Sequence, residues 1–570
     1  MIAAGQKRPR PGSSDEADAS NTSGSDMSIF RPPILRNAAL TAAASLNKAL
    51  FTSTYEIAAA QVHDVRLISK YQKALNSSKE LLRVERLASV ADVPENAATN
   101  PAAGDAAPAK PSPKKKCLLL RPGVVPSSPE TWSDVLKQGV EKSELGVIPY
   151  QLTLNYDHWT SRDVLVSVLP EEFHEDIPAG FNTAGHVAHL NLRDRFKPYK
   201  HIVGEVLLDK NPHLRTVINK VDLVGTESVF RTFPYEVLAG PDDMDVEVRE
   251  NGCTFSFDYS KVYWNSKLEP EHTRLLYLFK PGEVVVDLMA GIGPFAVPAG
   301  KRGVFVWAND MNPNSYEALG NAIKRNKAGS YVRPFNEDGL VFIHKSADLV
   351  RESSEANEGA LDVPDTVDSR NQQGSKPAQA QKQQQQQKQQ KQPAKEDSTA
   401  TSAAGGPKAR KQPPPRRHVP VPPTISHFVM NLPASAITFL PCFKGLYAAH
   451  EDLFKPVEGA EAPADKVYPK LPIVHTHCFA PKDDDQSIPF GDVRDRVSAE
   501  LGVEMTLCPR YEDMENDDPL AAESKNLVYV HNVRAVAPHK SMYCASFRLP
   551  ASVAFAPRTQ EGEKKAEKAE

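Results

Sequence analysis

Residues 284 to 326 constrain the fold of this chain more than any other stretch: VVVDLMAGIGPFAVPAGKRGVFVWANDMNPNSYEALGNAIKRN. The run opens with three valines and no polar face, which predicts a parallel strand buried on both sides and ending at Asp287. Gly291 and Gly293 follow in a turn where a ligand can approach the backbone and meet the amides of the next helix. A second apolar run stops at Asp310. This order predicts half of a doubly wound α/β fold with a nucleoside-sized site at its strand ends.

Two ligand classes fit the glycine turn. Dinucleotide-binding proteins use GxGxxG, and Ala296 in the sixth position is allowed by that pattern. Asp287 would repel a pyrophosphate, but its carboxylate could pair with the cationic ammonium of a methionine group. Asp310 is placed to accept hydrogen bonds from ribose hydroxyls. These features favour S-adenosylmethionine over NAD, and ordinary turn glycines of another α/β domain are the remaining alternative.

A second motif, HFVMNLP, occupies residues 427 to 433 and again ends an apolar run with polar groups. It resembles the Asn-Pro-Pro-Tyr type of loop that methyltransferases acting on nitrogen carry after their fourth strand. The amide of Asn431 and nearby carbonyls can accept hydrogen bonds from a planar N–H edge. Asn before Leu-Pro is also common in ordinary loops, so the motif gains weight only from its place after the glycine turn.

Composition limits the class of protein. A chain of 570 residues with 40% hydrophobic residues can form more than one globular core, and its 48 prolines indicate unstructured parts as well. The net charge is -4, so nucleic acid could bind only through local basic patches, and no apolar run is long enough to span a bilayer. Six scattered cysteines without a CxxC pair indicate reduced thiols inside a cell. His475 and His477 share one face of a predicted strand and Cys478 takes the other, which favours a structural role over a metal site.

The chain is expected to divide where its composition changes. Residues 352 to 420 form a Gln-, Lys- and Pro-rich insert that cannot build a packed layer. The predicted parts are a disordered tail at 1–26, an N-terminal segment at 27–146 with an Ala/Pro/Lys linker at 90–116, a small mixed domain at 147–240, a catalytic domain at 241–351 and 421–556, the insert, and a charged tail at 557–570.

The segment after Met27 has two interpretations. It carries Arg31, Arg36 and Lys48 but no acidic residue between Ser28 and Tyr55, which is the composition of a mitochondrial presequence if translation began at Met27. A helix belonging to the mature protein is the equal alternative. We therefore expect products in the mitochondrial matrix, the nucleus and the cytoplasm.

The small domain at 147–240 is predicted to dock nucleic acid. We expect strands in VLVSVLP, HVAHLNL and HIVGEVLLD, with basic residues beside them. Such charges usually form only a solvated face, but here they precede the predicted catalytic core. The basic residues are Arg193, Arg195, Lys197, Lys200, Lys210, Arg215 and Lys220.

The rest of the catalytic domain is predicted from two further patterns. A third strand ends in a polar turn, residues 336 to 339, which could recognise an adenine edge. The last segment, residues 527 to 550, alternates in two runs split by Pro538, which predicts an antiparallel pair that closes the sheet. Between them, ITFLPCFKGLYAAH is expected to be helical and PIVHTHCF a strand.

Several motifs in this order resemble one enzyme family, the eukaryotic and archaeal class of tRNA (guanine-N1)-methyltransferase that modifies guanosine 37, 3′ to the anticodon. The resemblance runs from about residue 29 to residue 550, outside the inserts. Its motifs are FRPPILR, FRTFPYEVLAG, FSFDYSKVYWNSKLEPEHTRL, VVVDLMAGIGPFAVPAG, NDMNP, FNEDG, FVMNLP and VHNVRAVAPHKSMYCASFRLP.

The resemblance implies roles for individual residues. Guanine N1 carries a proton, so methyl transfer needs a base and a donor that holds the charge moving onto O6. Glu271 matches the family's base, although a Glu at a helix start is also favoured by the helix dipole. Arg231 is the candidate O6 donor, Asn431 would orient the base or the methionine end, and Tyr263 matches a tyrosine near both ligands. Lys267 stands where the family usually has Arg, which keeps the charge but loses the bidentate geometry.

The expected ligands follow from the same resemblance. The cofactor is S-adenosylmethionine, no metal is needed, and tRNA is the partner of a monomer whose target base turns out into the pocket. An N-methyltransferase for another RNA site or for protein, and a non-catalytic RNA-binding protein, are the alternatives. The predicted cofactor-binding residues are His272, Asp287, Gly291, Gly293, Asp310, Met311, Asp338, Gly339 and Asn431.

Overall fold

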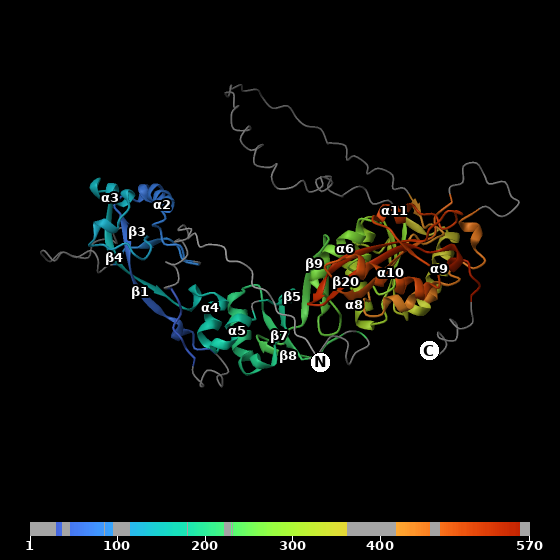
Figure 1. Cartoon of the computed structure of the whole chain (residues 1–570), viewed down its shortest axis with the longest axis horizontal. Helices are drawn as coiled ribbons and strands as arrows, with labels where there is room; N and C mark the ends of the chain where they lie inside the picture. The colour runs from blue at the N-terminus through green and yellow to red at the C-terminus, as the bar shows by residue number, and fades with distance from the viewer. Residues whose placement is uncertain are drawn as a thin grey trace, which may run out of the picture. The chain divides into compact units, whose positions relative to one another are not determined.

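The computed structural model describes residues 30–36, 46–84, 86–94, 115–178, 180–221, 230, 232–361, 418–455 and 468–558. These residues form two compact units (Figure 1). The first unit runs up to Val221 and includes Pro234–Asp243, and the second contains Met244 and the described residues beyond it. The bounds predicted for the insert, 352–420, were wrong at both ends, because helix α9 (Gly339–Glu355) continues past residue 352 and strand β14 (Gly359–Leu361) pairs with β15 (His418–Pro420). Residues 362–417 and most of both predicted tails lie outside the described residues.

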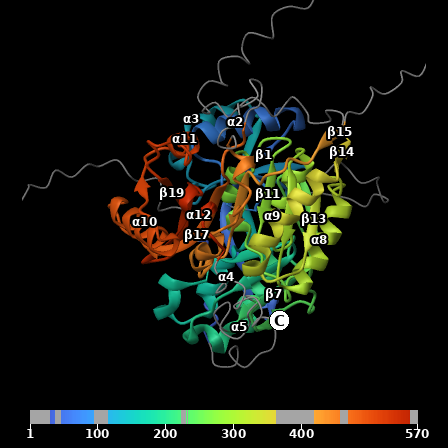
Figure 2. The same ribbon diagram turned by 90° about the vertical axis from the view of Figure 1, so that its right-hand side faces the viewer.

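The second unit is built on an eight-stranded sheet, which runs from yellow β13 toward red β19 in Figure 2. Its strands, in spatial order, are β13 (Val332–Phe335), β12 (Phe305–Asn309), β11 (Val284–Asp287), β16 (His427–Met430), β17 (Ile473–Pro481), β20 (Lys540–Arg548), β19 (Leu527–Ala537) and β18 (Thr506–Leu507). Strands β13, β12, β11, β16 and β17 run parallel to one another, whereas β20 is antiparallel to both β17 and β19.

The strand order reverses between β11 and β16. From β11 the chain steps outward through β12 to β13, and it later returns to β16 and steps the other way to β17. All four residues of β11 and of β16 are buried, as their apolar runs predicted. The doubly wound Rossmann-like fold is thereby confirmed, and ligands of such sheets bind outside the carboxyl ends of the strands at this reversal.

Helices connect and cover these strands. Those that bear on the site are α6 (Glu269–Leu276), α7 (Ala296–Lys301), α8 (Pro313–Arg325), α9 (Gly339–Glu355), α10 (Ser487–Leu501) and α11 (Tyr511–Asn516). Pro313 occupies the first turn of α8, and Asn312 caps it by accepting from the Asn314 amide. A short antiparallel pair, β9 (Asp245–Glu250) and β10 (Cys253–Asp258), precedes α6.

The closing hairpin of strands β19 and β20 confirms the predicted antiparallel pair, and Pro538 lies in its turn. Two register shifts interrupt the pairing, between Asn532 and Arg534 and between Ala535 and Ala537. Bulges of this kind are common next to active sites, where they re-aim side chains. The segment from residue 437 that was expected to be helical begins as the 3-10 helix η10 (Ala436–Phe443), and Pro441 lies inside it.

The first unit contains two four-stranded sheets. One has the order β2-β3-β1-β4 and the other β5-β6-β7-β8. The boundary predicted between residues 146 and 147 falls inside β4, which pairs with β1 over ten residues. Both ends of the predicted linker are strands, since β2 begins at Val90 and β3 at Lys116. The strands are β1 (Ser53–Val62), β2 (Val90–Asp92), β3 (Lys116–Leu119), β4 (Leu145–Leu154), β5 (Asn182–Ala184), β6 (Val187–Leu190), β7 (Thr216–Lys220) and β8 (Tyr235–Ala239).

Two strands expected in this unit were wrong. VLVSVLP belongs to α4 (Ser161–Val168), and HIVGEVLLD belongs to α5 (Lys200–Lys210). The start of α4 is fixed by a capping box in which Thr160 and Asp163 bond each other's amides, a signal that outweighs the β-branched valines. In α5 Gly204 packs so closely on β8 that an added Cβ would lie 2.6 Å from the Cβ of Leu238.

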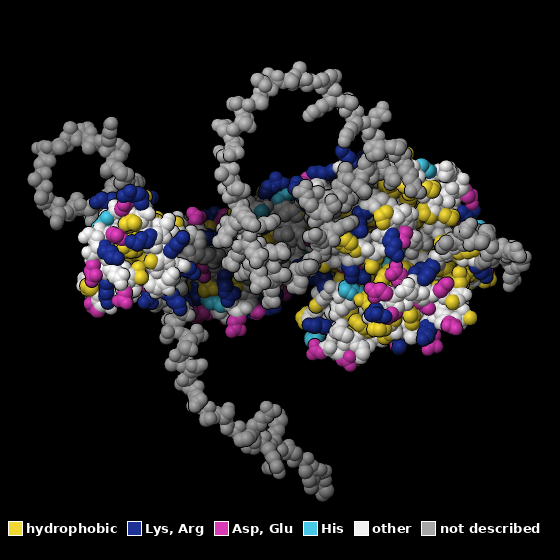
Figure 3. Space-filling view, turned by 90° about the horizontal axis from the view of Figure 1, so that it is seen from above, with side chains coloured by type: hydrophobic (Ala, Val, Ile, Leu, Met, Phe, Trp, Pro, Cys, Tyr) yellow, Lys and Arg dark blue, Asp and Glu magenta, His cyan; other side chains and the backbone are white. Residues whose placement is uncertain are grey.

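The basic residues predicted to dock nucleic acid are largely engaged within the unit. Carboxylates pair with five of them: Arg193, Arg195, Lys197, Lys200 and Arg215. Lys210 is buried, donates to the Tyr156 carbonyl, and has a pKa lowered to about 8 by burial. On the face shown in Figure 3, Lys and Arg side chains are interspersed with Asp and Glu.

The start of the described chain packs into the first unit. Phe30 is buried against Tyr55 with ring centroids 4.9 Å apart, and Ser167 donates to the Pro33 carbonyl at 2.5 Å. Residues 37–45 of the predicted presequence lie outside the described residues. No helix in the described ranges is long and apolar enough to cross a membrane.

Candidate functional site

The reversal of the strand order brings the two predicted motifs side by side. Asp287 pairs in register with Val429, and the Leu288 amide donates to the Val429 carbonyl at 3.0 Å. Strand β16 ends at Met430, so Asn431 follows it at the same edge of the sheet. Two segments more than 140 residues apart in the sequence therefore meet at the strand-order reversal, where sheets of this kind have their ligand crevice.

Asp287 is fully buried without an ordinary partner. Among the described residues, neither of its carboxylate oxygens accepts a hydrogen bond of normal geometry, although the Met289 amide is close enough to favour its ionised form slightly. Burial, and then the negative charge of Asp310, raise the pKa of Asp287 to about 8. A buried carboxyl group that lacks a partner is costly, so this site is suited to a cationic ligand group that would supply one.

The glycine turn is held by Asp310 at the end of β12. One Asp310 oxygen accepts from the Gly291 amide at 2.8 Å, and the other accepts from the Asn312 amide at 2.9 Å. Burial raises the pKa of Asp310. The Ser315 side chain also hydrogen-bonds this carboxylate. A carboxylate has about four acceptor positions, so one remains that could accept from a ribose hydroxyl while the others shape the turn.

The two glycines of the turn are needed for different reasons. Gly291 has φ +55° and open space where a Cβ would be, as a ligand-facing position requires. Gly293 has φ +92°, and a Cβ there would lie 2.6 Å from Leu319 Cδ1 and 2.9 Å from Val297 Cγ2. Gly293 therefore allows α7 to pack against α8, and Gly291 keeps the crevice open.

This difference predicts opposite phenotypes for two alanine variants. Gly293→Ala should lower the free energy of unfolding by about 1–3 kcal/mol, from backbone strain and overpacking against Leu319. Gly291→Ala should cost only about 1–2 kcal/mol, yet its methyl group would occupy the crevice and weaken S-adenosylmethionine binding by about tenfold or more. Denaturant unfolding and cofactor titration measure the two effects separately. Unchanged cofactor affinity in folded Gly291→Ala would place the ligand elsewhere.

The remaining predicted cofactor residues lie around this crevice. Asp338 caps α9 by accepting from the Leu340 amide, and a Cβ on Gly339 would lie 3.3 Å from the Phe439 ring. Met311 is 42% exposed beside them. Sequence analysis missed Asn309, whose buried side chain bonds the Leu288 carbonyl and both backbone groups of Glu337. The polar residue within the apolar run VFVWAN was the available signal, because a buried Asn must be hydrogen-bonded.

Glu271 lies in a cradle of cationic donors. Arg274 donates Nε to Oε2 and Nη2 to Oε1, both at 2.7 Å, and His477 donates Nε2 to Oε1 at 2.8 Å. The carboxylate is 1% exposed. Burial by itself would raise the pKa of Glu271, but these hydrogen bonds and charges outweigh it and hold the pKa well below its usual range. The carboxylate thus stays ionised, with one acceptor position left on Oε2.

The hydrogen-bond partners of His477 indicate that both of its ring nitrogens carry protons, so that the ring is an imidazolium. Its Nε2 faces the Glu271 carboxylate and its Nδ1 faces the Met430 carbonyl at 3.2 Å, so both nitrogens must donate. Burial opposes this charge, but the Cys544 sulfur and Glu271 raise the pKa of His477 to about 10. His477 links Glu271 to the residue before Asn431. Its pairing joins residues 206 positions apart and carried no signal in the sequence.

Glu271, His477 and Cys544 also bring three potential metal ligands within 4.8 Å of one another. Their lone pairs are committed elsewhere, since Arg274 occupies both carboxylate oxygens and both His477 nitrogens carry protons. A metal would have to displace Arg274 and a proton from His477, so we assign this cluster to the support of Glu271.

His272 joins the glycine turn to the Glu271 cradle. Its Nδ1 lies 2.5 Å from a Glu250 oxygen, and its ring packs edge-on against Phe295 at 4.7 Å. Phe295 lies two residues after Gly293, and its ring centroid is 6.5 Å from that of His477. The turn, Glu271 and His477 are therefore neighbours in one packed cluster.

A small cavity of about 30 Å³ lies beside Asn431. Tyr263 lines it with Asn431, and Arg534 of the closing hairpin contributes a basic side chain. The Oδ1 atom of Asn431 is buried and has no hydrogen-bond partner among the described residues, so it is placed to accept from a ligand N–H. The other lining residues are Asn265, Leu268, Pro433, Phe479, Val536 and Met542.

Two predicted residues fall outside this arrangement. Arg231 lies outside the described residues. Lys267 is exposed, and its backbone amide bonds the Asn265 side chain that caps the turn before α6. The structure thus brings together Asp287, the glycine turn, Asp310, Asn431, Tyr263, His272 and Glu271, and gives no position for the O6 donor.

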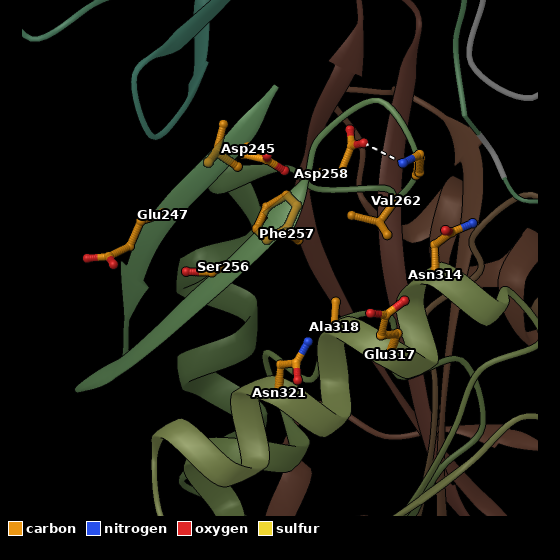
Figure 4. A pocket seen from close by; sticks show the side chains of 12 residues that line it. Asp245, Glu247, Ser256, Phe257, Asp258, Val262, Asn314, Glu317, Ala318 and Asn321 are labelled. Carbon is orange, nitrogen blue, oxygen red and sulfur yellow. Dashed lines mark ion pairs between the residues drawn. The ribbon is translucent and has the colours of Figure 1, made fainter. Parts of the chain in front are cut away.

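A hollow of about 500 Å³ lies elsewhere in the second unit (Figure 4). It lies between β10 and α8, and none of the predicted site residues lines it. Four carboxylates face it, and its lysine, Lys261, pairs with Asp258 at 2.9 Å. The hollow keeps a net negative charge, which would repel the phosphate backbone of a nucleic acid.

The chain is similar to known proteins along almost its whole length. Two family models match it, the TYW2 N-terminal domain at residues 161–243 and the TRM5/TYW2 methyltransferase domain at residues 246–351. A tRNA (guanine(37)-N(1))-methyltransferase of Neurospora crassa is 52% identical over 94% of this chain and 96% of its own length. One of Fusarium vanettenii is 48% identical over 94% and 98%. The crystal structure of wild-type Trm5b from Pyrococcus abyssi covers 86% of this chain and 99% of its own, with 17% identity and a TM-score of 0.46.

Proposed function

Because this chain belongs to the family of tRNA (guanine(37)-N(1))-methyltransferases, we propose that Glu271 is the base with which it methylates guanosine 37. The reaction moves the methyl group of S-adenosylmethionine to N1 of that guanosine in tRNA. The substrate is inferred from the family, and the roles of individual residues are inferred from their positions around the reversal of the strand order.

The buried carboxyl of Asp287 is the observation that carries the cofactor assignment. Its oxygens have no hydrogen-bond partner among the described residues, and Gly291, four residues on, has open space where a Cβ would be. When bound, S-adenosylmethionine supplies an electrophilic methyl group on a sulfonium. Asp287 would hold its ammonium, Asp310 its ribose, and the turn at Asp338 and Gly339 its adenine edge.

Two features of Glu271 support its assignment as the base: its carboxylate is ionised, and one acceptor position on it is open. Guanine N1 gives up its proton as the new N–C bond forms, so the base acts on a group whose acidity rises during the reaction. The carboxylate is ionised, and the one acceptor position left on Oε2 can receive the N1–H. Arg274 and His477 fix its direction, which is the benefit of a rigid supporting shell.

The target guanine would lie against Asn431 and Tyr263. The Oδ1 of Asn431 can accept from the exocyclic amino group of guanine, and the tyrosine ring offers a face for stacking. A base within a stacked loop cannot reach this depth, so the nucleotide must turn out of the stack. Arg231 stays the proposed donor to O6, and the small domain predicted at 147–240 stays the proposed docking domain for tRNA shape and phosphates.

The proposal is tested by incubating the purified chain with transcribed tRNA and S-adenosylmethionine. Nucleoside analysis should yield 1-methylguanosine, and primer extension should stop at position 37. A matched tRNA with adenosine at position 37 is the control for position. Methylation of another nucleotide or of protein under these conditions would support the alternatives, and binding of tRNA without product would support a non-catalytic role.

The segment after Met27 supports a proposal for the localisation of the protein. We propose import into mitochondria through residues 27 to 60 of a product that starts at Met27, together with nuclear and cytoplasmic products, and a monomer. A reporter fused to residues 27 to 60 should enter mitochondria, and its exclusion would contradict the import. Sedimentation of the purified chain checks the monomer.

A further inference from the structure

The proton taken by Glu271 must leave a buried site. Among the described residues, three basic side chains lie within 4.0 Å of its oxygens, and they are Arg274, His477 and His531. Arg274 is a permanent cation, and both nitrogens of His477 already donate hydrogen bonds. Neither can accept a further proton, and N1 of the methylated guanine has no electron pair left to take it back. Of these three side chains, His531 is therefore the one that could accept the proton.

His531 differs from both in charge and exposure. It lies on β19, and its Nε2 is 3.8 Å from Glu271 Oε2, the oxygen with the open acceptor position. The His531 side chain is 33% exposed, compared with 21% for Arg274 and 0% for His477. Burial and the positive charge of Arg274 lower the pKa of His531, so the imidazole is neutral near pH 7.

The groups packed around His531 leave the solvent-exposed side of its ring as the route for a proton. Helix α6 presents Glu271 and Arg274 to it, and β17 presents His477. On β20 the residue in register is Cys544, whose thiol is fully buried and offers no route to solvent. The register shift that follows Asn532 begins next to His531, as is common where a strand re-aims a side chain at a site.

We propose that His531 receives the proton from Glu271 and passes it to solvent. This inference rests on the proposed function, in which the N1–H bond breaks as the Oε2–H bond forms and the N1 electron pair takes the methyl group. The sulfur keeps the electron pair of the broken S–C bond. Next the Oε2–H bond breaks, Nε2 of His531 gains the proton, and the resulting imidazolium loses a proton to water. The 3.8 Å gap must shorten by about 1 Å to a hydrogen bond, as catalytic contacts do when substrate binds.

The test compares His531→Gln with His539→Gln on the full chain. His539 is exposed in the turn of the same hairpin and has no part in the site, so it controls for changes in the hairpin's charge. We expect His531→Gln to lower kcat at pH 7 by about 10- to 100-fold, with KM for tRNA within about twofold, because proton transfer and not binding is lost. His539→Gln should retain the wild-type kcat.

Rescue separates a proton acceptor from a structural residue. Imidazole added to His531→Ala should restore part of kcat, and the restored rate should rise with pH as the neutral fraction of imidazole rises. A kcat for His531→Gln within twofold of the wild type, or a slow His531→Ala that imidazole does not rescue, would overturn the relay. If Glu271→Gln abolishes turnover while His531→Gln does not, the relay alone is wrong. Full activity of Glu271→Gln would remove Glu271 as base and the relay with it.

Discussion

Glu271→Gln is expected to lower the rate of methyl transfer by about 10²- to 10⁴-fold, the usual contribution of a general base. Gln keeps the size of the side chain and one of its oxygens, but its amide is far too weak a base to take the N1 proton. The rate should be measured in single turnover at saturating S-adenosylmethionine and tRNA, where it reports the chemical step.

The same substitution should also destabilise the fold. Glu271 neutralises Arg274 and His477 in a buried place, and removing one partner of such a pair typically costs about 3–5 kcal/mol. His477 can limit this loss by releasing a proton, because Glu271 contributes to the charge that keeps its pKa raised. Cofactor affinity and thermal unfolding must therefore accompany the rate, so that lost chemistry is separated from lost structure.

Glu269→Gln is the matched control, since Glu269 lies in the first turn of the same helix but is exposed. It should change neither the rate nor the stability by more than a small amount. A folded Glu271→Gln that binds cofactor normally and methylates at the rate of Glu269→Gln would show that another group removes the proton.

Asp287→Asn is expected to weaken S-adenosylmethionine binding by about 10- to 100-fold, the loss of a charge-assisted hydrogen bond. The same change should stabilise the cofactor-free protein. The pKa of Asp287 is about 8 in the folded protein, above the value of about 4 in an unfolded chain. The contribution of Asp287 to the free energy of unfolding is therefore complete below pH 4 and is lost as pH rises toward 8. Asn has no proton to lose, so the variant keeps its stability over this range.

Cofactor affinity should carry the opposite pH dependence. The ammonium of the bound cofactor requires ionised Asp287, so wild-type affinity should rise with pH up to about 8, the pKa in the free protein. Titration of S-adenosylhomocysteine between pH 6 and 8.5 measures this rise, and Asp287→Asn should lack that part of it. Parallel pH profiles for both proteins, or a lower melting temperature for cofactor-free Asp287→Asn at pH 8, would contradict the assignment.

The sequence was a good guide wherever the pattern is local. Buried valines, the glycine turn and the acid after the second strand predicted half of a doubly wound sheet, because each depends on neighbours within a few residues. The two helices of the first unit were missed for a related reason. The β-branched residues of α4 and α5 favour strands locally, and in α4 the capping box of Thr160 and Asp163 overrides that preference.

The environment of Glu271 could not be predicted from local pattern. His477 reaches Glu271 across 206 residues, and the position of His531 depends on the pairing of β19 with β20. Alternation placed His475 and His477 on one strand face, but nothing in the sequence indicated what that face meets. A motif therefore identified Glu271, whereas its low pKa and its neighbours follow only from the packed sheet.

The most direct test of this account is a structure of the chain bound to tRNA and S-adenosylhomocysteine. We predict the amino nitrogen of the cofactor within hydrogen-bond distance of the Asp287 carboxylate, and N1 of guanosine 37 within hydrogen-bond distance of Glu271 Oε2, beside Asn431. A cofactor bound away from Gly291, or a guanosine 37 whose N1 faces a group other than Glu271, would contradict it.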